Sequence, residues 1–206
     1  MSERDLTRDE ILRYVTDIVH MQVQISQSIS EKLCKECGTE DPKWSERRRA
    51  IMEHLGGFMT PYDFCQRLPQ DELGIAALSV VTHLLKIQFA YAQVILMIDM
   101  IRGGSFQDVY MDSLSAIASK VHSQFVALAS LLDDLKEGRD PSADHGSTIM
   151  RLEREIDEDN IVICRQVSVA TGGDSSFVCY MMRKIVSELE HISDYLKQIA
   201  EILADF

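Results

Sequence analysis

Two pairs of acidic side chains are spaced so that they could bind a cation together. Glu153 and Asp157 are four residues apart, and so are Glu190 and Asp194. On a helix, residues four apart lie one above the other on the same face. Two carboxylates placed in this way repel each other, and a bound cation would relieve the repulsion. If two neighbouring helices brought all four together, they would form an oxygen-rich site suited to Mg²⁺, Mn²⁺, Ca²⁺ or iron.

Helical geometry predicts where these acids lie relative to the apolar core. Glu153 and Asp157 fall about 85° to one side of the apolar stripe of their own segment, and Glu190 and Asp194 about 130° from theirs. The two stripes are Ile149, Leu152, Ile156, Ile163 and Val167, and Ile185, Leu189, Ile192, Leu196, Ile199 and Leu203. We therefore expect the second pair to be more exposed than the first. An ordinary solvated acidic face, with Arg151 and Arg154 as partners, is the alternative to a metal site.

Other potential ligand patterns in the chain are weaker. Glu188-x-x-His191 has a spacing that ferritin-like di-iron bundles use twice, but its companion here is the poorer match Asp17-x-x-His20. Cys34 and Cys37 have metal-ligand spacing without the second pair of a zinc site, which favours an interpretation as residues at a helix end. The sequence contains no nucleophile elbow, phosphate-binding loop or dinucleotide fingerprint. It therefore does not predict an enzyme.

Composition and charge narrow the possible partners. The chain has 206 residues, with 21 Lys and Arg against 33 Asp and Glu, which gives a formal net charge of −12. Such a chain repels a nucleic-acid backbone on average. The polar start lacks the pattern of a secretory signal, and polar residues interrupt the apolar stretch Leu84–Ile101. We expect a cytoplasmic protein that reaches a membrane only through a partner.

The elements that must position the acids are helices. Apolar residues recur at three- and four-residue spacing, and Gly- and Pro-containing breaks separate six segments. The expected helices cover about 6–33, 44–55, 71–101, 105–135, 145–170 and 175–206. Short connections predict an all-α, six-helix antiparallel bundle in one domain, 1–206, divided three plus three around Gly103-Gly104. The apolar run Phe177–Met182 makes a homodimer a further expectation.

The sequence resembles the PhoU-like phosphate-transport regulators, in particular the accessory proteins of the low-affinity Pit phosphate permease. Three stretches carry the resemblance, together with the six-helix pattern: Phe58–Asp63, Leu152–Asp157 and Glu188–Asp194. The resemblance implies two tandem three-helix repeats, about 6–102 and 105–206, and no enzymatic activity. It also implies a metal ion or small metal cluster of unknown identity, a divalent or iron-type ion. The ligands in the second repeat would be Glu153, Asp157, Glu190 and Asp194.

The first repeat departs from this pattern. It has Glu46-Arg47-Arg48-Arg49-Ala50 and Val80-Val81-Thr82-His83-Leu84 where the resemblance leads us to expect acids. One of the two implied metal sites is therefore expected to be lost. The leading hypothesis is a non-enzymatic regulator that contacts a phosphate permease or a phosphate-signalling protein. The alternatives are a ferritin-like metal-handling bundle and an interaction scaffold that binds no metal.

Overall fold

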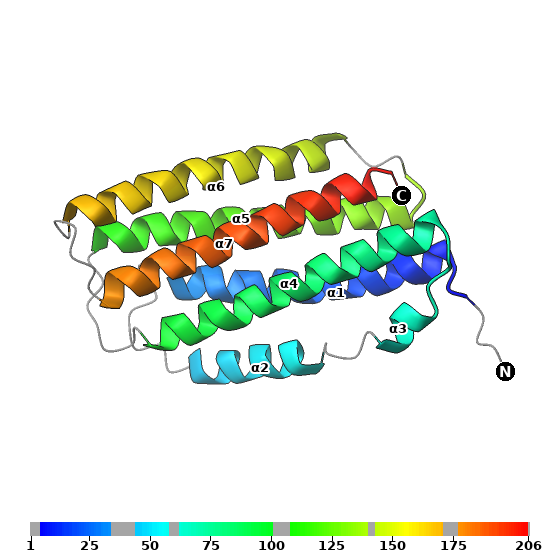
Figure 1. Ribbon diagram of the computed structural model, residues 1–206, viewed down its shortest axis with the longest axis horizontal. Helices are drawn as coiled ribbons and strands as arrows, with labels where there is room; N and C mark the ends of the chain where they lie inside the picture. Colours follow the sequence, from blue (N-terminus) through cyan, green and yellow to red (C-terminus); the bar gives the residue numbers. More distant parts are fainter. Residues whose placement is uncertain are drawn as a thin grey trace.

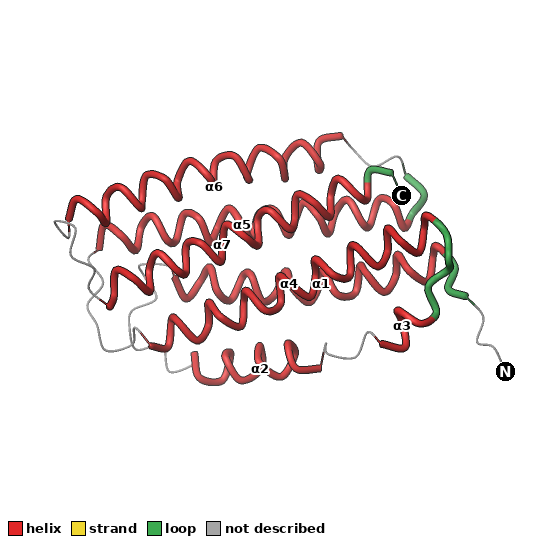
Figure 2. Tube along the Cα trace, in the orientation of Figure 1, coloured by secondary structure: helices red, strands yellow, loops and turns green. Residues whose placement is uncertain are grey.

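The described residues form seven helices. The computed structural model describes residues 5–33, 44–57, 62–100, 108–139, 143–170 and 177–205. The helices are α1 (Arg8–Leu33), α2 (Trp44–Gly57), α3 (Tyr62–Gln66), α4 (Glu72–Met100), α5 (Asp108–Lys136), α6 (Ala143–Ala170) and α7 (Phe177–Leu203). Figure 2 shows no strand among these residues. Each of the six predicted segments corresponds to one of the longer helices, and α3 is the helix that the sequence did not predict.

Local sequence signals fix several helix ends. Thr7 and Glu10 form a capping box at α1, where the Glu10 amide donates to Thr7 Oγ1 at 3.3 Å and the Thr7 amide donates to Glu10 Oε2 at 2.8 Å. Asp71 accepts a hydrogen bond from the Gly74 amide at 3.0 Å and caps α4. Gly74 lies so close to the carbonyl of Pro69 that a Cβ would be 1.8 Å from its oxygen. The turn before α4 therefore requires glycine.

The long helices pack in pairs that connect the two halves of the chain. α1 lies along α5, α4 lies along α7, and α6 covers α5 and α7 (Figure 1). The buried apolar residues of both halves form one continuous core. At its centre the rings of Tyr91 on α4 and Phe125 on α5 stack with centroids 5.8 Å apart.

The middle segments of the two halves differ in size. α6 has 28 residues, whereas α2 has 14 and α3 has 5. α2 makes a small contact with α1 and α4, through the buried side chain of Ile51 among others. α3 is held on α1 by the stacked rings of Tyr14 and Phe64, whose centroids are 3.9 Å apart. Among the described residues, the first half therefore has no middle helix as long as α6.

Helix α4 is the one helix in the described ranges that is long and apolar enough to cross a membrane by length and composition. Its inward side is part of the core, and Val80, Leu84, Tyr91 and Val94 are fully buried. Only 44% of its most apolar window is buried inside the protein, so its outward side is also apolar.

The apolar run at the start of α7 is not the continuous surface that the sequence suggested. Phe177 and Tyr180 are exposed, but Met181 and Met182 are buried. Since α7 is helical here, its residues alternate between the core and the surface with the helical period. This run therefore does not support the predicted homodimer.

Candidate functional site

Three of the four predicted acids meet where α6 lies against α7. The apolar stripes predicted for the two helices face the core, and every described member of both stripes is buried. Carboxylate oxygens of Glu153 and Asp157 on α6 and of Asp194 on α7 all lie within 4.8 Å of one another. We call these three residues the acidic triad. Three carboxylates at this separation offer the oxygen ligands that hard cations prefer.

The acidic triad is less exposed than its angular position on each helix predicted. Glu153 is only 6% exposed, and Asp157 and Asp194 are half-buried. Glu190 and Asp194 are both half-buried, and Glu153 of the first pair is the least exposed of the four. The angle was measured from the stripe of α7 alone, and α6 covers this side of α7.

A lysine that the sequence analysis did not single out lies within the site. Lys197 Nζ donates a hydrogen bond to Glu153 Oε1 at 2.8 Å. That bond, more than any other interaction, raises the pKa of Lys197, and the charges of Glu201 and Asp194 add to the effect. Lys197 follows Asp194 by three residues and so shares its face of α7. This spacing is the signal that could have identified it.

The remaining negative charge of the triad is unfavourable. Burial raises the pKa of Asp157, and the nearby charges of Glu153 and Asp194 raise it further. Burial and the charge of Glu153 likewise raise the pKa of Asp194. Lys197 opposes both shifts without cancelling them. A cation bound at the triad in addition to the Lys197 ammonium would therefore be stabilised by negative charge that the protein itself does not neutralise.

Glu190, the fourth predicted ligand, lies beside the acidic triad and outside it. Its side chain has a hydrogen bond to Asn160 of α6. Burial raises its pKa first, and the charges of Asp194 and Asp157 raise it further. The charges of the triad therefore affect the pKa of Glu190, while its carboxylate is held toward Asn160.

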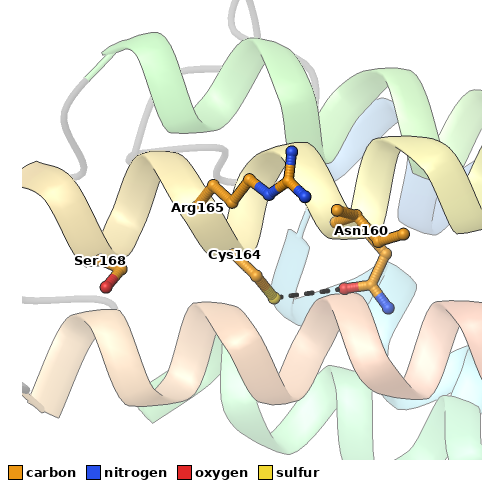
Figure 3. A pocket seen from close by; sticks show the side chains of 5 residues that line it. Asn160, Cys164, Arg165 and Ser168 are labelled. Atoms are coloured by element: carbon orange, nitrogen blue, oxygen red, sulfur yellow. Dashed lines mark hydrogen bonds between the residues drawn. The ribbon is translucent and has the colours of Figure 1, made fainter.

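An open depression continues from Asn160 along α6. Its volume is about 420 Å³, and its lining residues are Asn160, Ile161, Cys164, Arg165 and Ser168. Figure 3 shows Asn160, Cys164 and Ser168 pointing from α6 toward α7, whereas Arg165 points away. The Cys164 thiol donates to Asn160 Oδ1 at 3.4 Å. Because Asn160 is also bonded to Glu190, the depression and the triad adjoin each other.

One of the two arginines expected to neutralise the acids is engaged elsewhere. Arg151 pairs with Glu155 one turn along α6, on the side away from the triad. Lys120 of α5 bridges Glu155 and Asp159 at 3.3 and 2.8 Å. Arg154 is exposed. The interpretation as an ordinary solvated face therefore describes the α5 side of α6, but not the side that faces α7.

The structure does not bring the proposed di-iron ligands together. His191 lies 3.7 Å from Glu188 on its own helix, and His20 lies 3.3 Å from Asp133 of α5. Within the described ranges, the acidic triad is the group of three or more potential ligand side chains close enough to hold one ion. Cys34 and Cys37 lie outside the described residues.

The first half carries different chemistry at the corresponding place. Glu46 on α2 is exposed, and Arg48 Nε is 2.7 Å from Asp99 Oδ2 of α4. Val80 and Val81, which stand where acids were expected on α4, are buried in the core. In the part of the chain that the structure describes, the corresponding positions on α4 are therefore apolar, and the ion pair of α2 with α4 lies near the C-terminal end of α4, away from them.

The comparisons with known proteins bear on the fold. No protein-family model and no curated protein matches the chain. Among solved structures, the crystal structure of PhoU from Pseudomonas aeruginosa is similar, with a TM-score of 0.71 and 15% sequence identity. The match covers 93% of this chain and 93% of that one. The chain therefore has a PhoU-like fold over nearly its whole length.

Proposed function

We propose that the protein is a non-enzymatic regulator of phosphate transport that acts in the cytoplasm. It would act by contact with a phosphate permease of the Pit type or with a phosphate-signalling protein. The observation that carries the proposal is the PhoU-like fold, which extends over 93% of the chain. The motifs Leu152–Asp157 and Glu188–Asp194, which carry the sequence resemblance, lie on the facing helices α6 and α7. No covalent chemistry is needed for this role.

We further propose that the acidic triad binds one hard cation. Glu153, Asp157 and Asp194 would supply the oxygen ligands, and Glu190 lies near enough to join them after release from Asn160. The donor set fits a divalent or iron-type ion, since it consists of carboxylates. A bound ion would neutralise the acids and hold α6 against α7, which would fix the surface offered to the partner.

The pairing of Lys197 with Glu153 supports a second candidate, a docking module that binds no metal. The ammonium group already satisfies the most buried acid of the triad at 2.8 Å. In this candidate, Asp157, Glu190 and Asp194 would be an acidic patch for a basic segment of the partner. Lys197 therefore distinguishes the two candidates. Its ammonium group competes with a metal ion for Glu153, whereas a basic segment of the partner would bind Asp157, Glu190 and Asp194.

Phosphate uptake tests the regulatory role. We would delete the gene and measure uptake of labelled phosphate at low and high external phosphate. Loss of the phosphate response is expected, with recovery on re-expression of the wild-type chain. A variant with Glu153, Asp157, Glu190 and Asp194 changed to Gln or Asn should fail to restore it. Unchanged uptake in the deletion strain would refute the proposal.

Elemental analysis of untagged protein tests the metal candidate. One ion per chain is expected after loading with Mn²⁺ or iron, and none in the variant lacking the four acids. Lys197→Met should bind the ion more tightly than wild type, because the competing ammonium is gone. No ion in either protein would favour the docking module. Fe(II) oxidation with a bridged di-iron absorption band would instead support the ferritin-like alternative.

A further inference from the structure

Asn160 lies between the acidic triad and the depression on α6. It follows Asp157 by three residues, so it lies one turn beyond the triad on the same face of the helix. Its side chain is hydrogen-bonded to Glu190 of α7 and to the thiol of Cys164, which lines the depression. One amide group therefore contacts both the fourth acid and the depression.

The chemistry of the three side chains fixes the orientation of this amide. A carboxylate accepts hydrogen bonds and does not donate them, so the Asn160 NH₂ group donates to Glu190. The amide oxygen is left for Cys164, whose thiol donates to Asn160 Oδ1 at 3.4 Å. Figure 3 shows this orientation, with the amide oxygen toward the sulfur and the nitrogen turned away from it. In this orientation Cys164 keeps its proton, because a thiolate cannot donate to the amide oxygen.

The orientation of the amide depends on where the Glu190 carboxylate lies. Glu190 is near enough to Asp194 and Asp157 for their charges to act on it, and its hydrogen bond is to Asn160. If the carboxylate turns to the triad, the Asn160 NH₂ group loses this acceptor. Rotation of the amide then lets the NH₂ group donate to the Cys164 sulfur. A hydrogen bond donated to the sulfur favours the thiolate over the thiol.

We propose that Asn160 is a positioning residue that couples the acidic triad to the depression on α6. This coupling rests on the metal site proposed above. Without metal, Asn160 holds Glu190 away from the triad and holds Cys164 as a thiol. When a cation is bound at the triad, Glu190 leaves Asn160 and the amide turns to Cys164. The lining that the depression offers to a partner therefore differs between the two states.

Alkylation of Cys164 by iodoacetamide measures the coupling in the full chain. Bound Mn²⁺ should raise the rate at Cys164 about threefold or more, because the thiolate is the form that reacts. Metal that merely made the protein more rigid would lower the rate, since local opening would be rarer. Mass spectrometry reports each cysteine separately, and elemental analysis gives the ion content of the same sample. Cys65, half-buried on α3, is the internal control and should not react faster with Mn²⁺.

Removal of the Asn160 amide tests the coupling through metal affinity. Asn160→Leu should bind Mn²⁺ about three times more tightly than wild type, because Glu190 no longer has to leave a hydrogen bond. Loss of a residue that merely supports a metal ligand weakens binding instead. In the same variant, Cys164 should react no faster with Mn²⁺ than without it. Gln166→Leu is the matched control for affinity, because Gln166 is exposed on α6 and does not line the depression.

Glu190→Gln separates the coupling from the metal site itself. The new amide can still accept a hydrogen bond from Asn160, but the carboxylate that would join the triad is gone. This variant should bind Mn²⁺ through the three carboxylates of the triad, more weakly than wild type, and Cys164 should not respond to the ion. The double variant Asn160→Leu with Glu190→Gln should bind no more tightly than Glu190→Gln alone, since no carboxylate remains to be released.

The possible results distinguish the coupling from the metal hypothesis. If wild-type protein retains no Mn²⁺, the proposed metal site fails and the coupling fails with it. If the ion is retained and Cys164 reacts at an unchanged or lower rate, the coupling alone is wrong. Weaker binding of Mn²⁺ by Asn160→Leu, shown to be folded by thermal unfolding, would also overturn it. The wild-type measurement needs no variant, so it decides the question even if Asn160→Leu does not fold.

Discussion

The two halves of the bundle use the same long helices but differ in the helix between them. In the second half, the 28-residue α6 covers α5 and α7 and encloses three acids and a lysine. In the first half, the 14-residue α2 covers only part of α1 and α4, and the outward face of α4 is left exposed and apolar. Among the described residues, the half with the longer middle helix therefore carries a half-buried polar site, whereas the other half carries exposed apolar side chains on α4.

The comparison also shows where charge is tolerated. In the second half, burial of Glu153 is compatible with folding because Lys197 donates to it at 2.8 Å. A buried carboxylate without a partner would be strongly destabilising. In the first half, the ion pair of Arg48 and Asp99 is closer to solvent, with the arginine 42% exposed. The second half therefore depends on its polar contacts more than the first.

Core truncation in the two middle helices gives the largest expected difference. Ile156 on α6 is fully buried between α5 and α7, and we expect Ile156→Ala to lower the free energy of unfolding by about 3 kcal/mol. Ile51→Ala on α2 should lower it by only about 1 kcal/mol, because α2 can separate from α4 without opening the core. Urea unfolding measures both, and equal losses would show that α2 is as integral to the core as α6.

Removal of the lysine charge beside the buried Glu153 should have the next largest effect. Lys197→Met leaves Glu153 without its donor, and we expect a loss of about 2 kcal/mol without metal. Lys120→Met is the matched control, because the partners of Lys120 are each about one-third exposed and water can replace the lysine. That change should cost less than about 1 kcal/mol. The double variant Lys197→Met with Glu153→Gln should recover most of the loss, and failure to recover it would mean that Lys197 acts through packing.

The sequence predicts the helices well because their signals are local. Apolar residues at helical spacing, caps such as Thr7 and Glu10, and glycine- and proline-rich breaks all lie within a few residues of the ends they define. The stripe of α7 is buried as predicted, from Ile185 to Leu203. α3 was missed because five residues are too few to show a helical period.

The candidate site is predictable only in part, because it depends on how two helices pack. Spacing alone placed Glu153 with Asp157 and Glu190 with Asp194, but it could not give the rotation of α6 about α7. That rotation brings Asp194 close to Glu153 and Asp157, Glu190 close to Asn160, and Lys197 close to Glu153. The angular argument predicted too much exposure because it treated each helix as isolated from its neighbour.

The ion pair of the first half should contribute less than the lysine of the second. Arg48→Ala is expected to lower the free energy of unfolding by about 0.5 kcal/mol, since the arginine is partly exposed to solvent. High salt should reduce this difference by screening. A loss as large as that of Lys197→Met would contradict the view that α2 is held mainly by a small apolar contact. The comparison needs both variants under the same buffer conditions.

The smallest expected effect has the opposite sign and connects stability to the metal hypothesis. Burial and the charges of Glu153 and Asp194 raise the pKa of Asp157 above its ordinary value of 3.8, so the folded state holds this proton more tightly than the unfolded chain does. The resulting stabilisation is complete below the ordinary pKa and is lost as the pH rises through the folded-state value. At neutral pH without metal, Asp157→Asn should therefore stabilise the protein slightly, by less than the loss expected of Arg48→Ala, and the gain should vanish below about pH 3.8. With saturating Mn²⁺ at neutral pH, the wild-type protein should be more stable than Asp157→Asn, because only the wild type keeps a carboxylate ligand at this position. Thermal unfolding with and without the ion measures both signs, and an unchanged order in Mn²⁺ would favour the metal-free docking module.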